Sequence, residues 1–296
     1  MTFPAISDNG GPARVLVLGA TGMLGNAVLR WFAAHAGYDV MGSVRSAAGL
    51  RLLREDLRAR VHVGVDVESP DSLARLLDNT RPQAVVNCVG LVKQRAEAED
   101  PLAALPLNAL LPHRLARLCS LVGARLVHIS TDCVYSGSKG GYRETDAADA
   151  QDLYGRSKLL GEVDYANAVT LRTSIIGHEL ATEHSLIGWF LAQSGTVRGY
   201  RRAVFSGLPT VELARIIGDH VLPAPALRGL YHVSAEPIDK FALLQLVARQ
   251  YGKAAELVAD DRVIIDRSLD SQRFRTATGY APPPWPELVR RMQAFG

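Results

Sequence analysis

The residues Val15-Leu-Val-Leu-Gly-Ala-Thr-Gly-Met-Leu-Gly25 decide the fold of this chain. The aliphatic run predicts a buried strand, and Gly19, Gly22 and Gly25 follow it directly before an amphipathic stretch. Glycines let the backbone approach a pyrophosphate closely, and the N-terminus of the next helix attracts its negative charge. A glycine-rich turn alone is weak evidence, but between a strand and a helix it predicts a dinucleotide-binding loop.

Short aliphatic runs alternate with amphipathic stretches as far as Arg172. Several runs are apolar at nearly every position, which is typical of strands buried on both faces. The stretches between them, such as 22–36 and 107–122, have helical spacing. This alternation predicts an α/β fold built on a Rossmann-type, doubly wound parallel sheet. The expected strands are 14–18, 39–44, 61–65, 84–89, 125–129 and 169–172.

The last third of the chain is less regular, so we expect a smaller C-terminal domain that is interleaved with the sheet domain. Helical spacing recurs there, with one further strand candidate at 230–234. We interpret residues 1–13 as a flexible leader and 14–172 as the NAD(P)-binding domain. Residues 173–296 are mainly this smaller domain, with about 207–240 returning to the first domain. The expected helices of this part are 186–193, 211–222 and 241–251.

The residues after the second and third strands bear on the choice of cofactor. An acid after the second strand would bind the adenosine ribose 2′-hydroxyl, but the sequence there is Ser43-Val-Arg45-Ser46. Arg45 could pair with a 2′-phosphate, or it could be an ordinary surface arginine. Asp66 is placed to meet the adenine, or to serve as a helix cap or turn residue. The sequence therefore favours NADPH, with NADH as the alternative.

Polar residues also end the fourth and fifth strands, in Asn87-Cys-Val-Gly90 and Ser130-Thr131-Asp132. Because the carboxyl ends of parallel strands line the ligand crevice, we expect both segments to border the nicotinamide half of the site. The hydroxyl of Thr131 could bond a substrate carbonyl, or it could simply cap the strand end. Asn108, on the next helix, has either a functional or a fold-stabilising role.

Tyr154 and Lys158 are the strongest candidates for catalytic residues. Four residues apart on a helix, they share one face. An ammonium beside a phenol favours the phenolate, so we expect Lys158 to lower the pKa of Tyr154 from about 10 towards neutrality. A tyrosine tuned in this way exchanges a proton with a carbonyl or alcohol oxygen.

Composition excludes several other functions. The 296 residues carry a formal net charge of +3 and show no basic cluster with interleaved aromatic residues, so no nucleic-acid partner is expected. Three cysteines without paired spacing suit a reducing compartment, and no signal peptide or membrane span is apparent. We therefore expect a cytoplasmic protein with no membrane partner. The histidines lack ligand spacing, so no metal is expected. The sequence leaves open whether the chain forms a homodimer.

Taken in order, these motifs resemble the extended short-chain dehydrogenase/reductase superfamily. More narrowly, the chain is similar to the dTDP-4-dehydrorhamnose reductase-like branch in Ile129–Gly137, Gly141–Asp146, Tyr154–Glu162 and Ser268–Phe274. The resemblance spans roughly residues 14 to 290 and implies that the smaller domain, 173–296, is mainly a substrate-binding domain. Residues 174–206 depart from the usual dTDP-rhamnose enzyme.

The resemblance implies an NADP(H)-dependent reductase of a nucleotide-activated 4-keto-6-deoxy-sugar that serves cell-surface polysaccharide or deoxysugar biosynthesis. Its catalytic residues would be Thr131, Tyr154 and Lys158, with Tyr154 protonating the ketone oxygen and Lys158 holding the nicotinamide ribose. The substrate contacts expected are Thr131, Asp132, Val134, Tyr135, Arg201 and Arg202. The cofactor contacts expected are Gly19, Thr21, Gly22, Met23, Leu24, Gly25, Arg45, Asp66, Val67, Cys88, Val89, Gly90, Ser130, Tyr154 and Lys158.

Two rival functions remain. The first is a nucleotide-sugar epimerase or dehydratase of the same superfamily. It is disfavoured because Thr131 is followed by Asp132-Cys133 and not by the Asp-Glu pair that dehydratases typically need. The second is a non-catalytic, NADP-binding regulatory subunit, a class that this branch also contains. The intact set of Thr131, Tyr154 and Lys158 argues against it.

Overall fold

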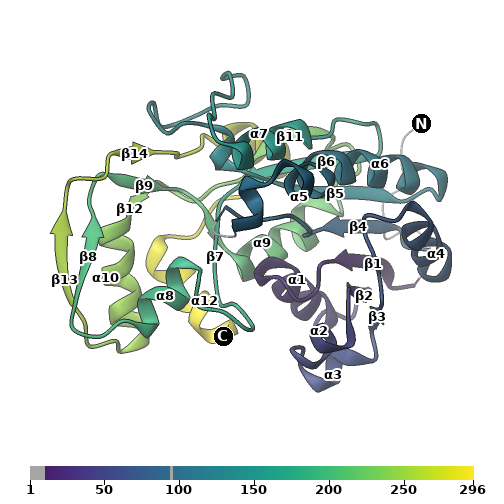
Figure 1. Ribbon diagram of the computed structural model, residues 1–296, viewed down its shortest axis with the longest axis horizontal. Helices are drawn as coiled ribbons and strands as arrows, with labels where there is room; N and C mark the ends of the chain where they lie inside the picture. Colours follow the sequence, from purple (N-terminus) through teal and green to yellow (C-terminus); the bar gives the residue numbers. More distant parts are fainter. Residues whose placement is uncertain (1–10, 94–95) are drawn as a thin grey trace.

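The computed structural model describes residues 11–93 and 96–296, and its centre is a parallel sheet of seven strands (Figure 1). The strand order is β3-β2-β1-β4-β5-β6-β11, and every pairing is parallel. The chain therefore starts in the middle at β1 and winds outward in both directions. The strands are β1 Ala13–Leu18, β2 Tyr38–Val44, β3 Val61–Val63, β4 Ala84–Asn87, β5 Arg125–Thr131, β6 Ala168–Thr173 and β11 Gly229–His232.

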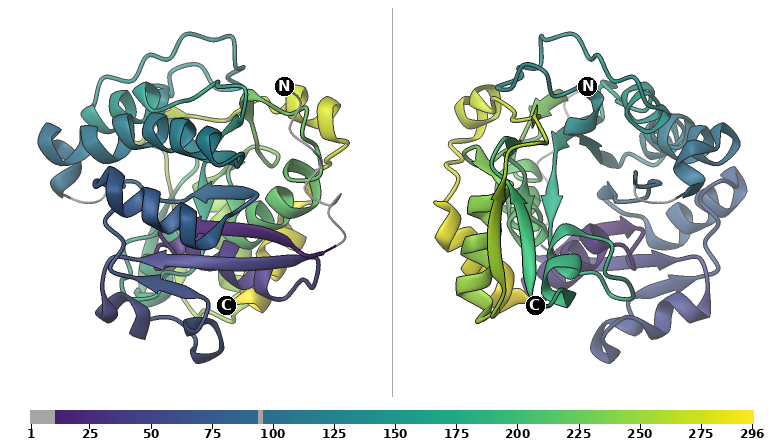
Figure 2. Two further views of the ribbon diagram at one scale, coloured as in Figure 1. Left: turned by 90° about the vertical axis from the view of Figure 1, so that its right-hand side faces the viewer. Right: turned by 60° about the vertical axis from the view of Figure 1, so that its left-hand side comes forward.

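Alternating side chains of β1 explain why the sheet is covered on both faces. Val15 and Val17 point into one hydrophobic cluster, and Leu16 and Leu18 point into another. Helices α1 (Met23–Ala33) and α9 (Thr210–Ile216) contribute to the first cluster. Helices α4 (Pro70–Thr80) and α6 (Leu111–Leu121) contribute to the second. Figure 2 shows these helix layers on either side of the sheet.

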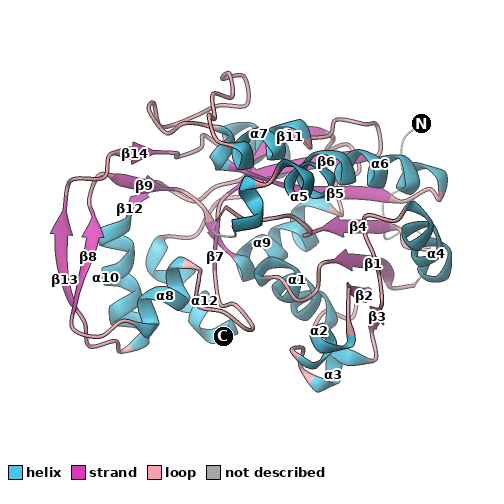
Figure 3. Cartoon of the chain, viewed as in Figure 1, coloured by secondary structure: helices cyan, strands magenta, loops and turns pink. Residues whose placement is uncertain are grey.

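A smaller unit lies beyond the carboxyl ends of the strands, on the left of Figure 3. In it β8 pairs with β13, and β9 lies between β12 and β14. Its helices pack into the same core cluster as α1 and α9, so the two units share a continuous interior. The elements are α8 Leu186–Ala192, β8 Thr196–Tyr200, β9 Ala203–Phe205, β12 Ile238–Asp239, α10 Lys240–Tyr251, β13 Glu256–Asp260, β14 Ile265–Asp266 and α12 Trp285–Phe295. Helix α11 (Gln272–Thr278) packs instead on β11 of the central sheet.

The predicted fold class is confirmed, and all seven predicted strands of the sheet are present. Strand β1 begins at Ala13, which the sequence assigned to the leader; residues 1–10 of that leader lie outside the described residues. The boundary between the domains stays our proposal, with β11 and α9 returning to the sheet domain. Short elements had no sequence prediction: α2 Ala47–Arg51, α3 Glu55–Arg58, α5 Pro101–Ala104, β7 Ile175–Ile176 and β10 Leu208–Pro209.

The predicted helix 107–122 begins instead with a π-helical turn, η2 (Leu105–Leu110), which passes into α6. A wider turn of this kind is common at functional sites. It carries Asn108, which is fully buried. No helix among the described residues has the length and apolar character needed to cross a bilayer.

Candidate active site

The glycine loop lies at the point where the chain order of the sheet reverses, between β1 and β4. Gly19 has a φ of +82°, a conformation that favours glycine, and a Cβ there would lie 3.1 Å from Val89 Cγ2. A Cβ on Gly25 would overlap the carbonyl oxygen of Gly19. The loop and the first turn of α1 are thus packed backbone to backbone, which requires glycine at both positions.

The N-terminus of α1 presents unbonded amides to the crevice. Its cap residue, Gly22, has no side chain to bond them, and the first turn contains no acid. The first backbone bond of the helix runs from Asn26 N to Gly22 O at 2.9 Å. The amides of Met23, Leu24 and Gly25 therefore precede the bonded part of the helix and are suited to an anion.

The segment that follows β2 lies close to this loop. Gly49, in α2, is so near that a Cβ there would be 3.4 Å from Thr21 Cγ2. Arg45 is exposed at the end of β2 and takes part in no ion pair between described residues. The carboxylate of Asp66 accepts a hydrogen bond of 3.0 Å from the amide of Glu68, so Asp66 shapes a turn. Val67 beside it is half-buried.

The fourth strand ends against the glycine loop. The amide of Cys88 donates to Leu18 O at 3.1 Å, and the amide of Val89 donates to the side-chain oxygen of Asn87 at 3.1 Å. A Cβ on Gly90 would lie 3.1 Å from Asn108 Oδ1 and 3.8 Å from Lys158 Nζ. This segment therefore joins the glycine loop to the lysine of the predicted catalytic set.

Asn108 holds that segment in place. Its Oδ1 accepts from the amide of Leu91 at 2.9 Å, and its Nδ2 donates to Leu91 O and to Ser157 Oγ, both at 3.2 Å. Of the two roles that the sequence left open, the fold-stabilising one is observed. Asn108 fixes the loop after β4 against α7 (Leu153–Leu160), the helix that carries Tyr154 and Lys158.

Tyr154 is brought to Thr131 by a close contact between α7 and the turn that follows β5. Asp152 caps the helix by accepting from the amide of Gly155 at 2.7 Å. A Cβ on Gly155 would overlap the carbonyl oxygen of Cys133 in η3 (Asp132–Val134). The absent side chain lets the helix start touch the strand end, and Tyr154 lies within hydrogen-bonding reach of the Thr131 side chain.

The prediction that Lys158 lowers the pKa of Tyr154 is wrong. Burial raises the pKa of Tyr154, with the neighbouring Cys133 adding to it, and the hydrogen bond with Thr131 opposes the rise only in part. The Lys158 ammonium donates to the carbonyl oxygen of Ile129 at 2.8 Å. Burial lowers the pKa of Lys158 to about 8. At neutral pH both groups hold their protons, so Tyr154 is equipped to donate one.

The other predicted substrate residues differ in their surroundings. Asp132 is buried, and burial raises its pKa although Thr131 donates to its Oδ1 at 3.2 Å. The side chains of Val134 and Tyr135 are fully buried, and the Tyr135 hydroxyl accepts from Arg172 at 2.5 Å. Because neither side chain reaches the surface, we assign them no direct contact with a substrate.

Ser130 belongs to a buried charge network beneath the strand ends. Its hydroxyl donates to Glu162 at 2.6 Å, and Glu162 pairs with Arg172 through two bonds of 2.8 and 2.5 Å. His232, on β11, contacts the Arg172 guanidinium at 2.9 Å, and its pKa is lowered to about 4 by burial and by that cation. The network connects β5, β6 and β11, and the Ser130 hydroxyl is one of its hydrogen-bond donors.

Arg201 and Arg202 lie in the exposed turn between β8 and β9. The guanidinium of Arg201 is engaged by Asp261, with one bond of 2.8 Å. The structure therefore does not bring Arg201 into the Thr131 and Tyr154 cluster. Sequence reasoning missed the positioning roles of Gly155 and Glu162. The position of Gly155 inside a helical motif could have indicated a close contact there. Nothing in the sequence indicated the partners of Glu162.

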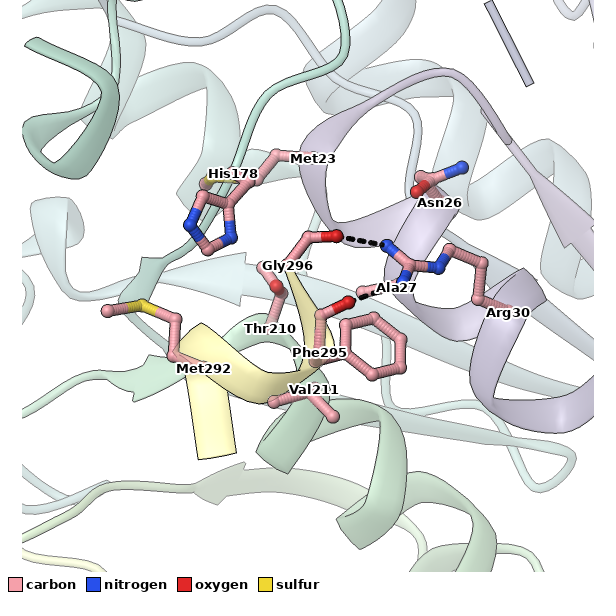
Figure 4. A pocket seen from close by; sticks show the side chains of 10 residues that line it. All are labelled: Met23, Asn26, Ala27, Arg30, His178, Thr210, Val211, Met292, Phe295 and Gly296. Atoms are coloured by element: carbon pink, nitrogen blue, oxygen red, sulfur yellow. Dashed lines mark hydrogen bonds between the residues drawn. The ribbon is translucent and has the colours of Figure 1, made fainter. Parts of the chain in front are cut away.

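A hollow beside Met23 lies on the α1 side of the glycine loop (Figure 4). Arg30 closes it by donating to the carbonyl oxygens of Phe295 and Gly296, the latter at 3.2 Å. His178 lines the same hollow and bonds the Tyr251 hydroxyl at 3.0 Å. The bonds of Arg30 seat the end of α12 on α1, which gives the hollow a structural explanation. Within the described ranges, no group of three or more His, Cys, Asp or Glu is arranged to hold a metal.

Together, the seven-stranded sheet and the glycine loop define a Rossmann-type protein, with Thr131, Tyr154 and Lys158 clustered at the carboxyl end of β5 as its candidate site. The chain belongs to the family described as the RmlD substrate binding domain, whose model matches residues 13–293.

Curated relatives carry two different names. A dTDP-4-dehydrorhamnose reductase of Mycobacterium tuberculosis is 31% identical over 170 residues, which are 54% of this chain and 49% of the relative. The chain thus spans about half the length of that reductase. Methionine adenosyltransferase 2 subunit beta of Danio rerio is 29% identical over 253 residues, 79% of this chain and 73% of the relative.

Solved structures share the fold across almost the whole chain. A dTDP-4-dehydrorhamnose reductase from Bacillus anthracis in complex with NADP has a TM-score of 0.78 at 19% identity, with 98% of this chain and 100% of that one covered. The Bordetella bronchiseptica enzyme WbmG in complex with NAD has a TM-score of 0.77 at 20% identity, with 97% and 95% covered. At these identities the likeness establishes the fold alone.

Proposed function

We propose that this protein is an NADP(H)-dependent reductase of a nucleotide-activated 4-keto-6-deoxy-sugar. The observation that carries the proposal is the meeting of Thr131, Tyr154 and Lys158 at the carboxyl end of β5. Gly90 lies beside the Lys158 ammonium there, and its neighbours Cys88 and Val89 pack against Gly19 of the glycine loop. Family membership and the names of the relatives support the substrate class.

The residues present fit a dinucleotide. The packed Gly19 and Gly25 backbone leaves the α1 N-terminus clear of side chains, and its amides suit a pyrophosphate. Arg45 extends from the end of β2 without an ion-pair partner among the described residues, as a group that binds a 2′-phosphate would. We therefore propose NADPH as the cofactor and keep NADH as the alternative. When bound, the cofactor supplies the hydride.

Tyr154 would supply the proton. Its raised pKa keeps the phenol protonated at neutral pH, so it can donate to the ketone oxygen as negative charge develops there. Thr131, within hydrogen-bonding reach of the phenol, would orient the same oxygen. Lys158, anchored to Ile129 O, would place its ammonium beside the nicotinamide ribose.

A regulatory, non-catalytic role is the second candidate, and one observation favours it. The relative aligned over the larger share of this chain is named as a subunit of methionine adenosyltransferase. A cofactor-binding subunit would still need the glycine loop but would not need a proton donor. The buried, protonated Tyr154 beside Thr131 supports the reductase instead. We regard the epimerase or dehydratase function as a weaker alternative, because Cys133 follows Asp132.

The test is a substrate screen. The purified protein would be mixed with NADPH and each of several dTDP- and UDP-linked 4-keto-6-deoxy-sugars, and loss of reduced-nicotinamide absorbance would be followed. We expect oxidation of NADPH with at least one of them and formation of the corresponding 4-hydroxy sugar. NADPH binding without turnover of any such sugar would favour the regulatory role.

We further propose that the reaction serves polysaccharide or deoxysugar biosynthesis in the cytoplasm, where nucleotide sugars are the substrates. The three cysteines, all free in the structure, support a reducing compartment. A homodimer stays a proposal that sedimentation of the purified protein would test.

A further inference from the structure

Asn87 and His128 are two buried polar side chains that are register partners in the neighbouring strands β4 and β5. Asn87 Nδ2 lies 3.2 Å from His128 Nδ1. On the other side of β5 the register partner of His128 is Thr170 of β6. The Thr170 hydroxyl is committed to Val163, because it accepts from the Val163 amide at 3.1 Å and donates to the Val163 oxygen at 2.7 Å. Asn87 is therefore the neighbour in the sheet to which His128 is bonded.

The hydrogen bonds of Asn87 determine which nitrogen of His128 carries the proton. Asn87 Oδ1 accepts from the amide of Val89 at 3.1 Å, so Nδ2 is the group that faces His128. A reversed side-chain amide would set two donors against each other at Val89. Because Asn87 donates, His128 Nδ1 must accept, and the proton of the neutral ring lies on Nε2. Burial and the charges of Lys158 and His113 lower the pKa of His128, which favours this neutral form.

A histidine is costly at this position. Its Nε2 is buried and has no hydrogen-bond partner within residues 11–93 and 96–296. A buried donor without an acceptor destabilises the folded state, and an aliphatic side chain would avoid that loss. What the imidazole of His128 adds, and an aliphatic side chain could not, is the acceptor that Nδ1 provides to Asn87.

The bond between His128 and Asn87 is connected to the cofactor crevice. Asn87 is the last residue of β4, and its Oδ1 fixes the amide of Val89 two residues further on. Cys88 and Val89 pack against the glycine loop, since a Cβ on Gly19 would lie 3.1 Å from Val89 Cγ2 and 3.3 Å from the Cys88 carbonyl. A rotation of the Asn87 side chain would release the Val89 amide and change the surface against which the glycine loop packs.

We propose that His128 is a positioning residue for the dinucleotide cofactor. By accepting from Asn87, it holds the segment after β4 in the shape against which the glycine loop packs. The inference rests on the proposed function, because it takes the crevice to bind NADP(H). A residue that positions the cofactor site affects binding in the ground state and in the transition state alike. Its loss should therefore raise the KM for NADPH and affect kcat less.

Three variants and one spectrum test the proposal. His128→Leu removes the acceptor, and His128→Asn keeps one at the δ position of the side chain. Thr170→Val is the matched control, since it removes buried hydrogen bonds that lead to Val163 and not to the glycine loop. For each variant, NADP⁺ affinity would be measured by isothermal titration, beside the KM for NADPH, kcat and thermal unfolding. Nitrogen NMR of the wild-type histidines would locate the ring proton of His128, whose signals are those lost in His128→Asn.

We expect about tenfold weaker NADP⁺ binding in His128→Leu, with most of the affinity restored in His128→Asn. Thr170→Val should unfold at a lower temperature and bind NADP⁺ like wild type. The NMR spectrum should show the His128 proton on Nε2 from pH 6 to 8.

Three results would overturn the proposal: wild-type NADP⁺ affinity in a folded His128→Leu, equal losses in His128→Leu and His128→Asn, or a His128 proton on Nδ1. If His128→Leu does not fold, the affinity of His128→Asn and the NMR spectrum still decide. A wild-type protein that does not bind NADP⁺ would contradict the assignment of the cofactor, and with it the proposed function.

Discussion

The ammonium of Lys158 donates a hydrogen bond of 2.8 Å to the backbone carbonyl oxygen of Ile129 in β5. This bond ties the lysine to the strand and not to the phenol of Tyr154. The pKa of Tyr154 is raised by its own burial, and Lys158 does not offset that rise. A neutral tyrosine at the strand end is the state that a reduction needs, because the ketone oxygen must receive a proton as hydride arrives.

Activity should fall as Lys158 loses its proton. Burial lowers the pKa of Lys158 to about 8, so its ammonium is charged at pH 7 and becomes neutral as the pH rises through about 8. We expect kcat/KM of the wild-type protein to decline above that pH. The measurement is a pH profile of NADPH oxidation from pH 6 to 10. Lys158→Arg carries a charge that persists through this range, so any activity it retains should lack the decline. A decline of the same shape in both proteins would assign it to another group.

Gly155→Ala should weaken both stability and activity. The new methyl group would overlap Cys133 O, which forces α7 away from η3 and separates Tyr154 from Thr131. Overpacking of this kind typically costs about 1–3 kcal/mol. Thermal unfolding and kcat would be measured side by side. Gly49→Ala, another helical glycine whose nearest neighbour would be 3.4 Å away, is the control and should be neutral or slightly stabilising. Equal unfolding temperatures for the two variants would refute the packing argument.

Arg45→Ala should reduce the preference for NADPH over NADH. Arg45 is exposed at the end of β2, where a 2′-phosphate would lie. Loss of a charge-assisted pair should raise the KM for NADPH about tenfold or more and leave the KM for NADH nearly constant. The comparison needs both cofactors with one substrate. An equal rise in KM for both cofactors would contradict the assignment of Arg45 to the 2′-phosphate.

The double variant Arg201→Ala/Arg202→Ala tests whether the turn between β8 and β9 contributes to substrate binding. A contact with a remote phosphate is alike in ground and transition states, so its loss should raise the substrate KM and affect kcat less. The NADPH KM should stay constant. Arg201 is already paired with Asp261, so the alternative is that both arginines are surface residues without a role in substrate binding. An unchanged substrate KM would support that alternative.

The sheet could be predicted from the sequence because buried parallel strands leave continuous apolar runs. The short strands of the smaller unit could not, since elements such as β12 and β14 have two residues each and no periodicity to detect. The motif predicted that Tyr154 and Lys158 share a helix face. It could not predict the direction of the Tyr154 pKa, because that depends on how tightly α7 closes on η3. The position of Arg267 could not be predicted for a similar reason: only the tertiary fold brings its Nη1 within 3.7 Å of the Cys133 sulfur.

The most direct test of the central claim, that Tyr154 donates the proton in a keto-sugar reduction, is the rate of NADPH oxidation by wild type and Tyr154→Phe. The assay would use a 4-keto-6-deoxy nucleotide sugar that wild type reduces. Removal of a general acid typically costs about 10² to 10⁴-fold, so we expect kcat to fall by at least that order. NADPH affinity should be unchanged, because the phenylalanine keeps the packing of α7. Near-normal turnover in Tyr154→Phe would contradict the account.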